Sequence, residues 1–299
     1  MSLFDKYVAV DWSSSATPKA GKDSIWVGQV GRRKELLASA NPRTRSSAMA
    51  LVERICAEAI ANGDRVLMLF DFAFGLPSGG AVAHSGAASW DAYWRHLHRE
   101  IRDQDDNASN RFHVAARMND KAAAGAPLFW GHPWQHRYDG LTPKKPKDNH
   151  LAVAELRLAE QRSRGAQPVW KLNGAGCVGS QALLGISRLQ SLREHPLIGQ
   201  HVAIWPFETG FAEDLTSQIV IAEIFPSLVN IVGRDGMIRD QAQVEAVARL
   251  FAAADQANEL ERLLDRPADM NGEALGRVLR EEGWIVGVGH EDLVARLQV

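Results

Sequence analysis

The sequence predicts an α/β protein, and three observations lead to that class. Residues 7–11 and 65–71 form apolar, β-branched runs, the composition of strands that are covered on both faces. Residues 46–61 between them place apolar side chains at helical spacing. Strands that alternate with amphipathic helices favour a sheet with parallel neighbours and with helices packed against it.

The first third of the chain has the clearest order of elements. A polar turn and the tight connection GRRK separate three short apolar runs, which predicts a three-stranded meander. The helix that follows carries Met49, Val52 and Ile55 on one face, and Asn62-Gly63 ends it. The predicted elements are strands at 7–11, 24–30, 36–39 and 65–71 and a helix at 46–61.

A segment at about residues 78–148 interrupts this order, and we expect it to be a helical and loop insertion. It contains Gly-rich turns, a polar link, a Trp/His/Pro-rich stretch and one predicted helix at 88–101. After the insertion we expect helices at 151–164 and 241–254, an amphipathic segment at 182–192, and strands at 168–172, 201–208 and 219–225.

Length and composition limit the class of protein. The 299 residues suffice for one large domain, or for a core domain with a substantial insertion. There is no apolar run of about 18 residues and no basic-then-apolar leader, so we expect a cytoplasmic protein without a membrane partner. Cys56 and Cys177 are the only cysteines and lack metal-ligand spacing, which excludes a disulfide framework and a zinc ribbon. The sequence does not indicate an oligomeric state.

Three acidic residues end apolar runs. Asp11, Asp71 and Glu223 each follow or close a predicted strand, where a sheet would bring them to one edge. Burying carboxylates beside apolar strands costs several kcal/mol without compensation, and a divalent cation held by oxygen ligands is a common remedy. We therefore expect the three carboxylates to converge on a metal site, Mg²⁺ or Mn²⁺. The alternative is that they cap turns or helices.

The net charge of −2 conceals an asymmetry along the chain. Residues 130–171 hold eight Lys or Arg and four Asp or Glu, whereas residues 235–299 hold seven and thirteen. The basic stretch mixes cations with aromatic rings, a combination able to grip phosphates and to stack on bases; it includes Arg137, Lys144, Lys145 and Lys147 among Trp130, Trp134 and Tyr138. The plainer interpretation is a solvated surface loop.

Four short motifs carry a family resemblance. The order VAVDWS, DFAFGLP, AEIFPS and then the acidic helix DQAQVEAVARLFAAAD resembles uncharacterised bacterial and archaeal proteins described as predicted nucleases with a ribonuclease H-like fold. The resemblance covers most of the chain. It implies a single ribonuclease H-like domain over residues 1–299, with a mixed sheet, flanking helices and the insertion.

By the same resemblance, the metal ligands are Asp11, Asp71, Glu223 and an acid of the last helix, Asp240 or Glu245. The chain departs from the pattern at Gln243 and Glu245, where related proteins often carry an Asp pair. Phosphodiester cleavage with two metal ions needs them roughly 4 Å apart, one activating water and one stabilising the leaving oxygen. In that scheme Asp11 bridges the ions, Asp71 and Glu223 complete the ligand set, and Glu245 or Asp240 binds the second ion or receives a proton.

The turn after Asp11 also suggests a second class of enzyme. The segment SSSATPKAGK after Asp11 resembles the phosphate-binding hairpin of sugar kinases and actin-like ATPases, which share this core fold. There Ser13, Ser14 and Ser15 would cradle a phosphate with backbone N–H groups, near Lys22. Farther along the chain, Lys171 would neutralise a substrate phosphate, as would Arg157, or each would form an ion pair.

The loop at residues 174–179 has the Gly-x-Gly-x-x-Gly pattern between a predicted strand and helix. Such a loop binds the pyrophosphate of a dinucleotide when an acid follows at about 20 residues. Glu208 comes too late for that spacing, so a tight turn is favoured. A label from molybdopterin-guanine dinucleotide synthesis has no support here beyond this loop.

The favoured function is therefore divalent-metal-dependent phosphoryl transfer, most concretely the hydrolysis of nucleic-acid phosphodiesters. An actin-like nucleotide phosphotransferase is the second hypothesis. A non-catalytic protein that binds nucleotides or nucleic acid is the third.

Overall fold

The computed structural model describes residues 2–147, 151–229, 231 and 236–298. Its centre is one six-stranded mixed sheet in the order β3-β2-β1-β4-β6-β5. β2 is antiparallel to its two neighbours, β1 and β3, and β4, β6 and β5 run parallel to β1. The prediction of an α/β protein with a mixed sheet and flanking helices is confirmed. The strands are β1 (Lys6–Asp11), β2 (Trp26–Gly31), β3 (Leu36–Ala40), β4 (Val66–Phe70), β5 (Val202–Ile204) and β6 (Ile219–Glu223).

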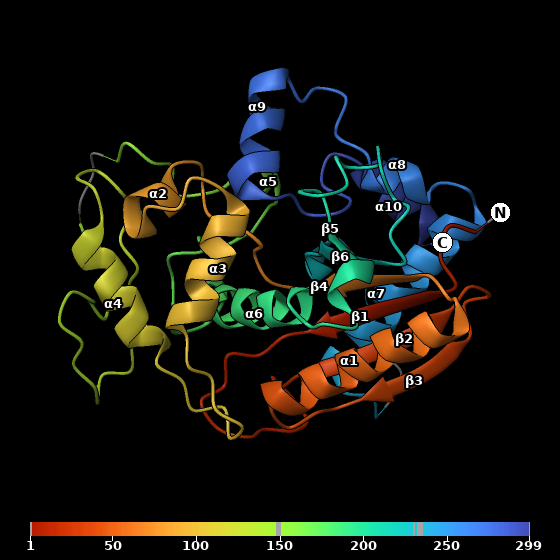
Figure 1. Ribbon diagram of the computed structural model, residues 1–299, viewed down its shortest axis with the longest axis horizontal. Coiled ribbons are helices and arrows are strands. Elements are labelled where there is room, and N and C mark those ends of the chain that lie inside the picture. Colours follow the sequence, from red (N-terminus) through yellow and green to blue (C-terminus); the bar gives the residue numbers. More distant parts are fainter. Residues whose placement is uncertain (1, 148–150, 230, 232–235, 299) are drawn as a thin grey trace.

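Helices cover both faces of this sheet (Figure 1). They are α1 (Arg45–Asn62), α2 (Gly80–Ser85), α3 (Trp90–Glu100), α4 (Arg111–Lys121), α5 (Leu158–Arg162), α6 (Val178–Arg193), α7 (Arg239–Gln256), α8 (Leu260–Leu264), α9 (Gly272–Arg277) and α10 (Glu291–Leu297). The helix α1 begins with a capping box of Thr44 and Ser47 and ends at Gly63, whose φ of 72° is left-handed.

Strand alternation divides the apolar core into two clusters. On β1, Val8 and Val10 pack with α1, α3 and α6, whereas Tyr7 and Ala9 pack with α7, α8 and α10. Successive side chains of a strand point to opposite faces, so the parity of a residue decides which layer of helices it meets. The acidic residues at the strand ends follow the same alternation, which determines which of them lie on the same face of the sheet.

The insertion contributes α2, α3 and α4, which lie together at the end of the molecule opposite to the termini (Figure 1). Its predicted end at Asp148 lies outside the described residues. The rings of Trp94 and Phe112 and the side chain of Leu97 belong to the same buried cluster as one face of the sheet. The insertion is therefore joined to the sheet by a continuous apolar core.

Some predicted elements are shorter than expected. The helix predicted at 151–164 is limited to α5, because Glu155 and Arg157 lie in an extended segment bound to Trp170 and to the buried acids. The strand predicted at 168–172 makes only an isolated bridge through Lys171, and the strand at 201–208 is reduced to β5. None of the described helices is long and apolar enough to cross a membrane.

Candidate active site

A cleft of about 730 Å³ opens where β1 ends. One wall is the turn that follows β1, a second is the loop before α6, and a third is the first turn of α7. The lining residues are Asp11, Trp12, Ser13, Ser14, Lys22, Asp23, Ser24, Gly176, Cys177, Gln181, Ile238, Arg239, Asp240 and Gln243. This combination of segments brings together residues that are more than 200 positions apart in the sequence.

Asp11 and Asp71 meet at the inner end of the cleft. Because β1 and β4 are parallel and Val10 pairs with Phe70, Asp11 and Asp71 follow at the same level of adjacent strands. Their carboxyl groups are joined by a hydrogen bond. The backbone N–H of Trp12 donates to Asp71 Oδ1 at 2.6 Å and holds the inner carboxyl in place. Asp11 faces the cleft, and Asp71 lies behind it.

The pKa of each carboxyl group is raised, so both keep their protons to a higher pH than usual. Burial raises the pKa of Asp11 to about 7, the hydrogen bond from Asp71 opposes this, and the charges of Asp240 and Asp23 add to it. Burial and then the charge of Asp11 raise the pKa of Asp71 well above its ordinary value. The pair therefore shares protons near neutral pH, because two touching carboxylates cannot both ionise without a cation.

Among the described residues, no Lys, Arg or His forms an ion pair with Asp11 or Asp71. Some other acids with buried side chains do have such partners, whereas the buried Asp255 accepts from the N–H groups of Leu3 and Phe4 and from the Tyr7 hydroxyl. Asp103 binds Arg45 and Arg188, and Glu282 binds Arg277. The negative charge of the Asp11–Asp71 pair is thus not balanced by an ion pair within the described residues.

Glu223 does not lie with this pair. It pairs with Phe70 in the β4–β6 register, one level before Asp71. The offset of one residue turns its side chain to the other face of the sheet, away from α7. There Arg157 donates to both oxygens of Glu223, at 2.8 and 2.5 Å, and the Phe74 N–H donates to it at 2.9 Å.

Arg157 is fully buried, and its neighbours explain why it stays charged. Burial lowers its pKa, but Glu160 and Glu223 outweigh burial and raise it above the ordinary value. Arg157 thus forms an ion pair, one of the two roles expected from the sequence, although in the interior rather than at the surface.

The two acids predicted on the last helix have different surroundings. Asp240, in the first turn of α7, lines the cleft, and its Oδ2 accepts from the Asp23 N–H at 2.6 Å. Its charge is close enough to Asp11 to raise the pKa of that carboxyl. Glu245 is buried away from the cleft and bonds to Gln241 and Arg249. Two other residues of α7 line the cleft beside Asp240: Arg239, which begins the helix, and Gln243, about one helical turn later.

The phosphate-binding residues predicted on the first turn face the same cleft. Ser13, Ser14 and Lys22 line it, and Lys22 forms no ion pair within the described residues. Opposite them lies Gly176 of the glycine loop, which leads into α6. The side chain of Gln181 in α6 donates to the Trp12 carbonyl at 2.6 Å and ties the two walls together.

Lys171 stands behind the glycine loop rather than in the cleft. Its Nζ donates to the carbonyl of Ala175 at 2.5 Å and lies 5.9 Å from the centre of the Trp130 ring. This contact orders the loop. A direct contact between Lys171 and a phosphate in the cleft is not indicated.

The donor set fits one hard cation better than two. Within residues 2–147, 151–229, 231 and 236–298, no cluster of three or more His, Cys, Asp or Glu side chains has the arrangement of a metal site. Asp11 and Asp71 supply carboxylate oxygens in contact, and the incomplete charge balance of the pair matches a divalent ion. Mg²⁺ is commonly held by one or two carboxylates with water as the remaining ligand, so these residues are sufficient for a single ion.

Searches for related proteins found no match to this chain among protein-family models, curated proteins or solved structures. Its function is therefore argued from the geometry of the site.

Several cleft residues escaped the sequence analysis as site candidates, among them Asp23, Arg239 and, on the wall formed by the glycine loop and α6, Gly176, Cys177 and Gln181. The glycine pattern was visible, but its spacing to Glu208 favoured a tight turn. The missing information was tertiary, because only the packing of α6 against the end of β1 brings this loop to the acids.

Proposed function

We propose that this chain is a divalent-metal-dependent phosphoryl-transfer enzyme with a ribonuclease H-like core, and that it hydrolyses nucleic-acid phosphodiesters. The observation that carries the proposal is the contact between Asp11 and Asp71 at the inner end of an open cleft, where neither carboxyl forms an ion pair among the described residues. Lys22 and Arg239 line the same cleft without pairing with these acids, whereas Glu223 is bound by Arg157.

Asp11 and Asp71 would hold the metal ion, with Asp240 adding negative charge from α7. A bound Mg²⁺ or Mn²⁺ stabilises charge on phosphoryl oxygens and lowers the pKa of water. The protein's own contribution is to orient the Asp71 carboxyl through the Trp12 N–H, and both carboxyls would give up their protons to bind the ion.

The turn that follows Asp11 suits a phosphate. Lys22 supplies a positive charge, and Ser13 and Ser14 supply hydroxyl groups, all facing the cleft. Lys22 is exposed, which suits a group that meets the substrate from solvent. A phosphodiester bound between Lys22 and Asp11 would place its reacting phosphorus beside the metal-binding carboxylates.

A nucleic-acid substrate is favoured by the basic stretch next to the glycine loop. Lys171 and Lys144 lie 5.9 and 5.8 Å from the centres of the Trp130 and Trp134 rings, respectively. Trp134 is 70% exposed. Exposed rings beside cations suit stacking on bases together with attraction to the phosphate backbone.

The second candidate is a nucleotide phosphotransferase of the actin-like class. One observation favours it: the Ser13–Ser14 turn and the glycine loop before the 16-residue helix α6 face each other across the cleft. Two loops with backbone N–H groups on opposite sides resemble a cradle for a polyphosphate.

A cleavage assay separates these candidates. Labelled single strands, duplexes and RNA–DNA hybrids are incubated with Mg²⁺, Mn²⁺ or EDTA, and ATP hydrolysis is followed in parallel. The proposal predicts metal-dependent cleavage that Asp11→Asn and Asp71→Asn abolish and that Glu245→Gln retains. ATP hydrolysis without strand cleavage would support the phosphotransferase, and inactivity in both assays would support a binding protein.

A further inference from the structure

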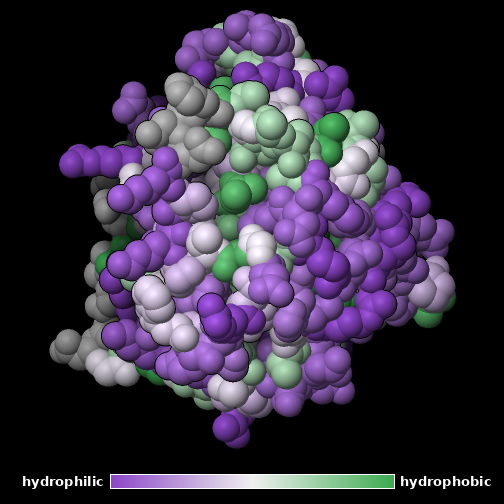
Figure 2. Space-filling view, turned by 90° about the vertical axis from the view of Figure 1, so that its left-hand side faces the viewer, coloured by the Kyte–Doolittle hydropathy of each residue, from purple (hydrophilic) through white to green (hydrophobic). Residues whose placement is uncertain are grey.

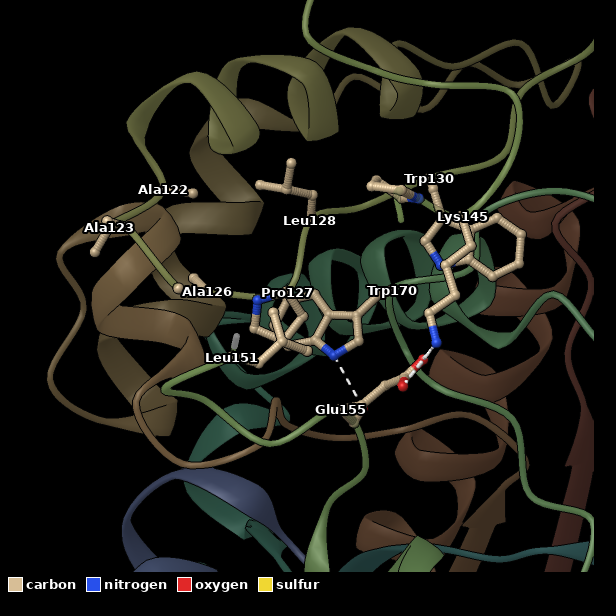
Figure 3. A pocket seen from close by; sticks show the side chains of 13 residues that line it. Ala122, Ala123, Ala126, Pro127, Leu128, Trp130, Lys145, Leu151, Glu155 and Trp170 are labelled. Carbon is tan, nitrogen blue, oxygen red and sulfur yellow. Dashed lines mark hydrogen bonds and ion pairs between the residues drawn. The ribbon is translucent and has the colours of Figure 1, made fainter. Parts of the chain in front are cut away.

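A second pocket lies in the insertion, apart from the acidic cleft. Its volume is about 230 Å³, and Figure 3 shows its side chains around one space, with the alanines of residues 122–126 at one end and Lys145 and Glu155 at the other. No residue lines both this pocket and the cleft. It opens on the side of the molecule that carries α2 and α4, where Figure 2 shows small apolar areas within a mainly hydrophilic surface.

Hydrogen bonds join the walls of this pocket. The Trp170 indole N–H donates to the Glu155 carbonyl at 2.9 Å, and the Trp130 N–H donates to the Trp170 carbonyl at 2.9 Å. The Ala152 N–H donates to the Gly125 carbonyl at 2.7 Å. Because three separate segments are tied to one another, the pocket is formed before any ligand binds.

The size of the pocket limits the ligand to a ring or a small fragment. Drug-sized ligands occupy roughly 300–1,000 Å³. A space of about 230 Å³ lies below that range and suits a heteroaromatic ring system rather than a whole nucleotide. Any sugar or phosphate attached to such a ring would remain outside.

The lining combines apolar surface with one charged edge. The half-buried Trp130 offers a surface on which a planar ring can pack, while the buried Pro127 and Trp170 form the floor, and Trp170 packs on His84 and Phe129. At the mouth, Lys145 Nζ lies 2.6 Å from Glu155 Oε1, with side-chain exposures of 53% and 34%. An ammonium donor beside a carboxylate acceptor matches the edge of a base that carries both a ring or carbonyl acceptor and an N–H donor.

We propose that this pocket binds a purine nucleobase, with the ring on Trp130 and its polar edge on Lys145 and Glu155. Guanine is the best match, since its N1–H and amino group both donate to a carboxylate and its O6 accepts from an ammonium. Lys144 and Lys147 are exposed and adjacent in sequence to Lys145 and Pro146 of the lining, so their charges attract the phosphate that stays outside. The base belongs either to a free nucleotide or to an unpaired position of a strand.

Calorimetry with GMP, AMP, UMP and ribose 5-phosphate tests this site. EDTA is present throughout, so that binding is measured without the metal chemistry of the cleft. We expect GMP to bind most tightly, AMP and UMP more weakly, and ribose 5-phosphate not at all. Equal binding of ribose 5-phosphate and GMP would show that only the phosphate is bound and would overturn the proposal.

Two variants locate the binding, and one is a matched control. Trp130→Ala should weaken GMP binding about 5- to 100-fold through lost stacking. Glu155→Gln should reduce the preference for GMP over UMP about tenfold. Leu197→Ala removes an exposed apolar side chain that does not line the pocket and should leave GMP affinity unchanged. Thermal melts check that each variant is folded, and a GMP soak of crystals provides a readout that needs no variant.

An oligonucleotide with one unpaired guanosine distinguishes the two sources of the base. If it binds more tightly than GMP and competes with it, the pocket takes a base from a strand. If only GMP binds, the ligand is a free nucleotide. If crystals soaked in GMP show the ring elsewhere, or if Trp130→Ala binds GMP as the wild type does, the pocket is not a nucleobase site.

Discussion

Two buried acidic sites at the end of the same sheet differ in one respect, the presence of a cation. Glu223 ends β6 and is held by Arg157 through two hydrogen bonds. Asp11 and Asp71 end β1 and β4, touch each other, and have no ion-pair partner in the described part of the chain. A register step of one residue separates the two sites. The sheet thus has one acid neutralised by the protein itself and a pair that the proposed metal ion would neutralise.

The largest effect on stability is expected at the neutralised site. Arg157→Ala leaves Glu223 and Glu160 buried without a cation and should lower the free energy of unfolding by about 3–5 kcal/mol. Urea denaturation measures this loss. The matched control is Arg117→Ala, which breaks the exposed pair with Glu100 and should cost about 0–1 kcal/mol. Equal losses for the two variants would show that Arg157 contributes no more than a surface ion pair.

At the Asp11–Asp71 pair, a substitution is expected to raise the free energy of unfolding instead of lowering it. The pKa of Asp11 is about 7 in the folded protein and about 4 when unfolded, so the folded state binds the proton more tightly. Wild-type stability without metal should therefore fall as pH rises from about 4 to 7. Asp11→Asn removes this fall and should be more stable than wild type at pH 8, by about 1–3 kcal/mol.

Urea melts in EDTA at pH 5 and pH 8 measure this difference. If Asp11→Asn destabilises the protein by about 0.5–2 kcal/mol at both pH values, Asp11 caps the turn after β1 instead.

Much of this arrangement was predictable from local sequence. The runs at 7–11, 65–71 and 219–225 are apolar and β-branched, and they form β1, β4 and β6 within about two residues at each end. The order of the three antiparallel strands followed from their tight connections. The short α5 was not predictable, because buried contacts of Arg157 override the helical spacing of its segment.

The site was predictable only in part. The positions of Asp11 and Asp71 at strand ends suggested their meeting, but the pairing of Glu223 with Phe70 is a property of the β4–β6 register. Register is a property of two paired strands and cannot be read from the sequence of one of them. A shift of one residue turns each side chain to the opposite face of the sheet. The role of Arg157 was equally hidden, since its partner lies 66 positions away.

A smaller effect is expected on the phosphate side of the cleft. Lys22→Ala removes an exposed positive charge and should raise KM for a nucleic-acid substrate about 2- to 5-fold, with kcat little changed. Lys19→Ala is the matched control, because Lys19 lies on the same turn but pairs with Asp23 at 3.7 Å and does not line the cleft. Steady-state kinetics at two salt concentrations compares them. A larger increase in KM for Lys19→Ala than for Lys22→Ala would indicate that the substrate phosphate does not bind at Lys22.

The most direct test of the central claim is the change in melting temperature on adding Mn²⁺ at pH 8, for wild type and for Asp11→Asn. Mn²⁺ at about 100 times its Kd should stabilise the wild type by about 2.7 kcal/mol, which corresponds to roughly 5 °C for a chain of this size. The Asp11→Asn variant should show little or no shift. An unchanged wild-type melting temperature, or an equal shift in both proteins, would contradict a metal site at Asp11 and Asp71.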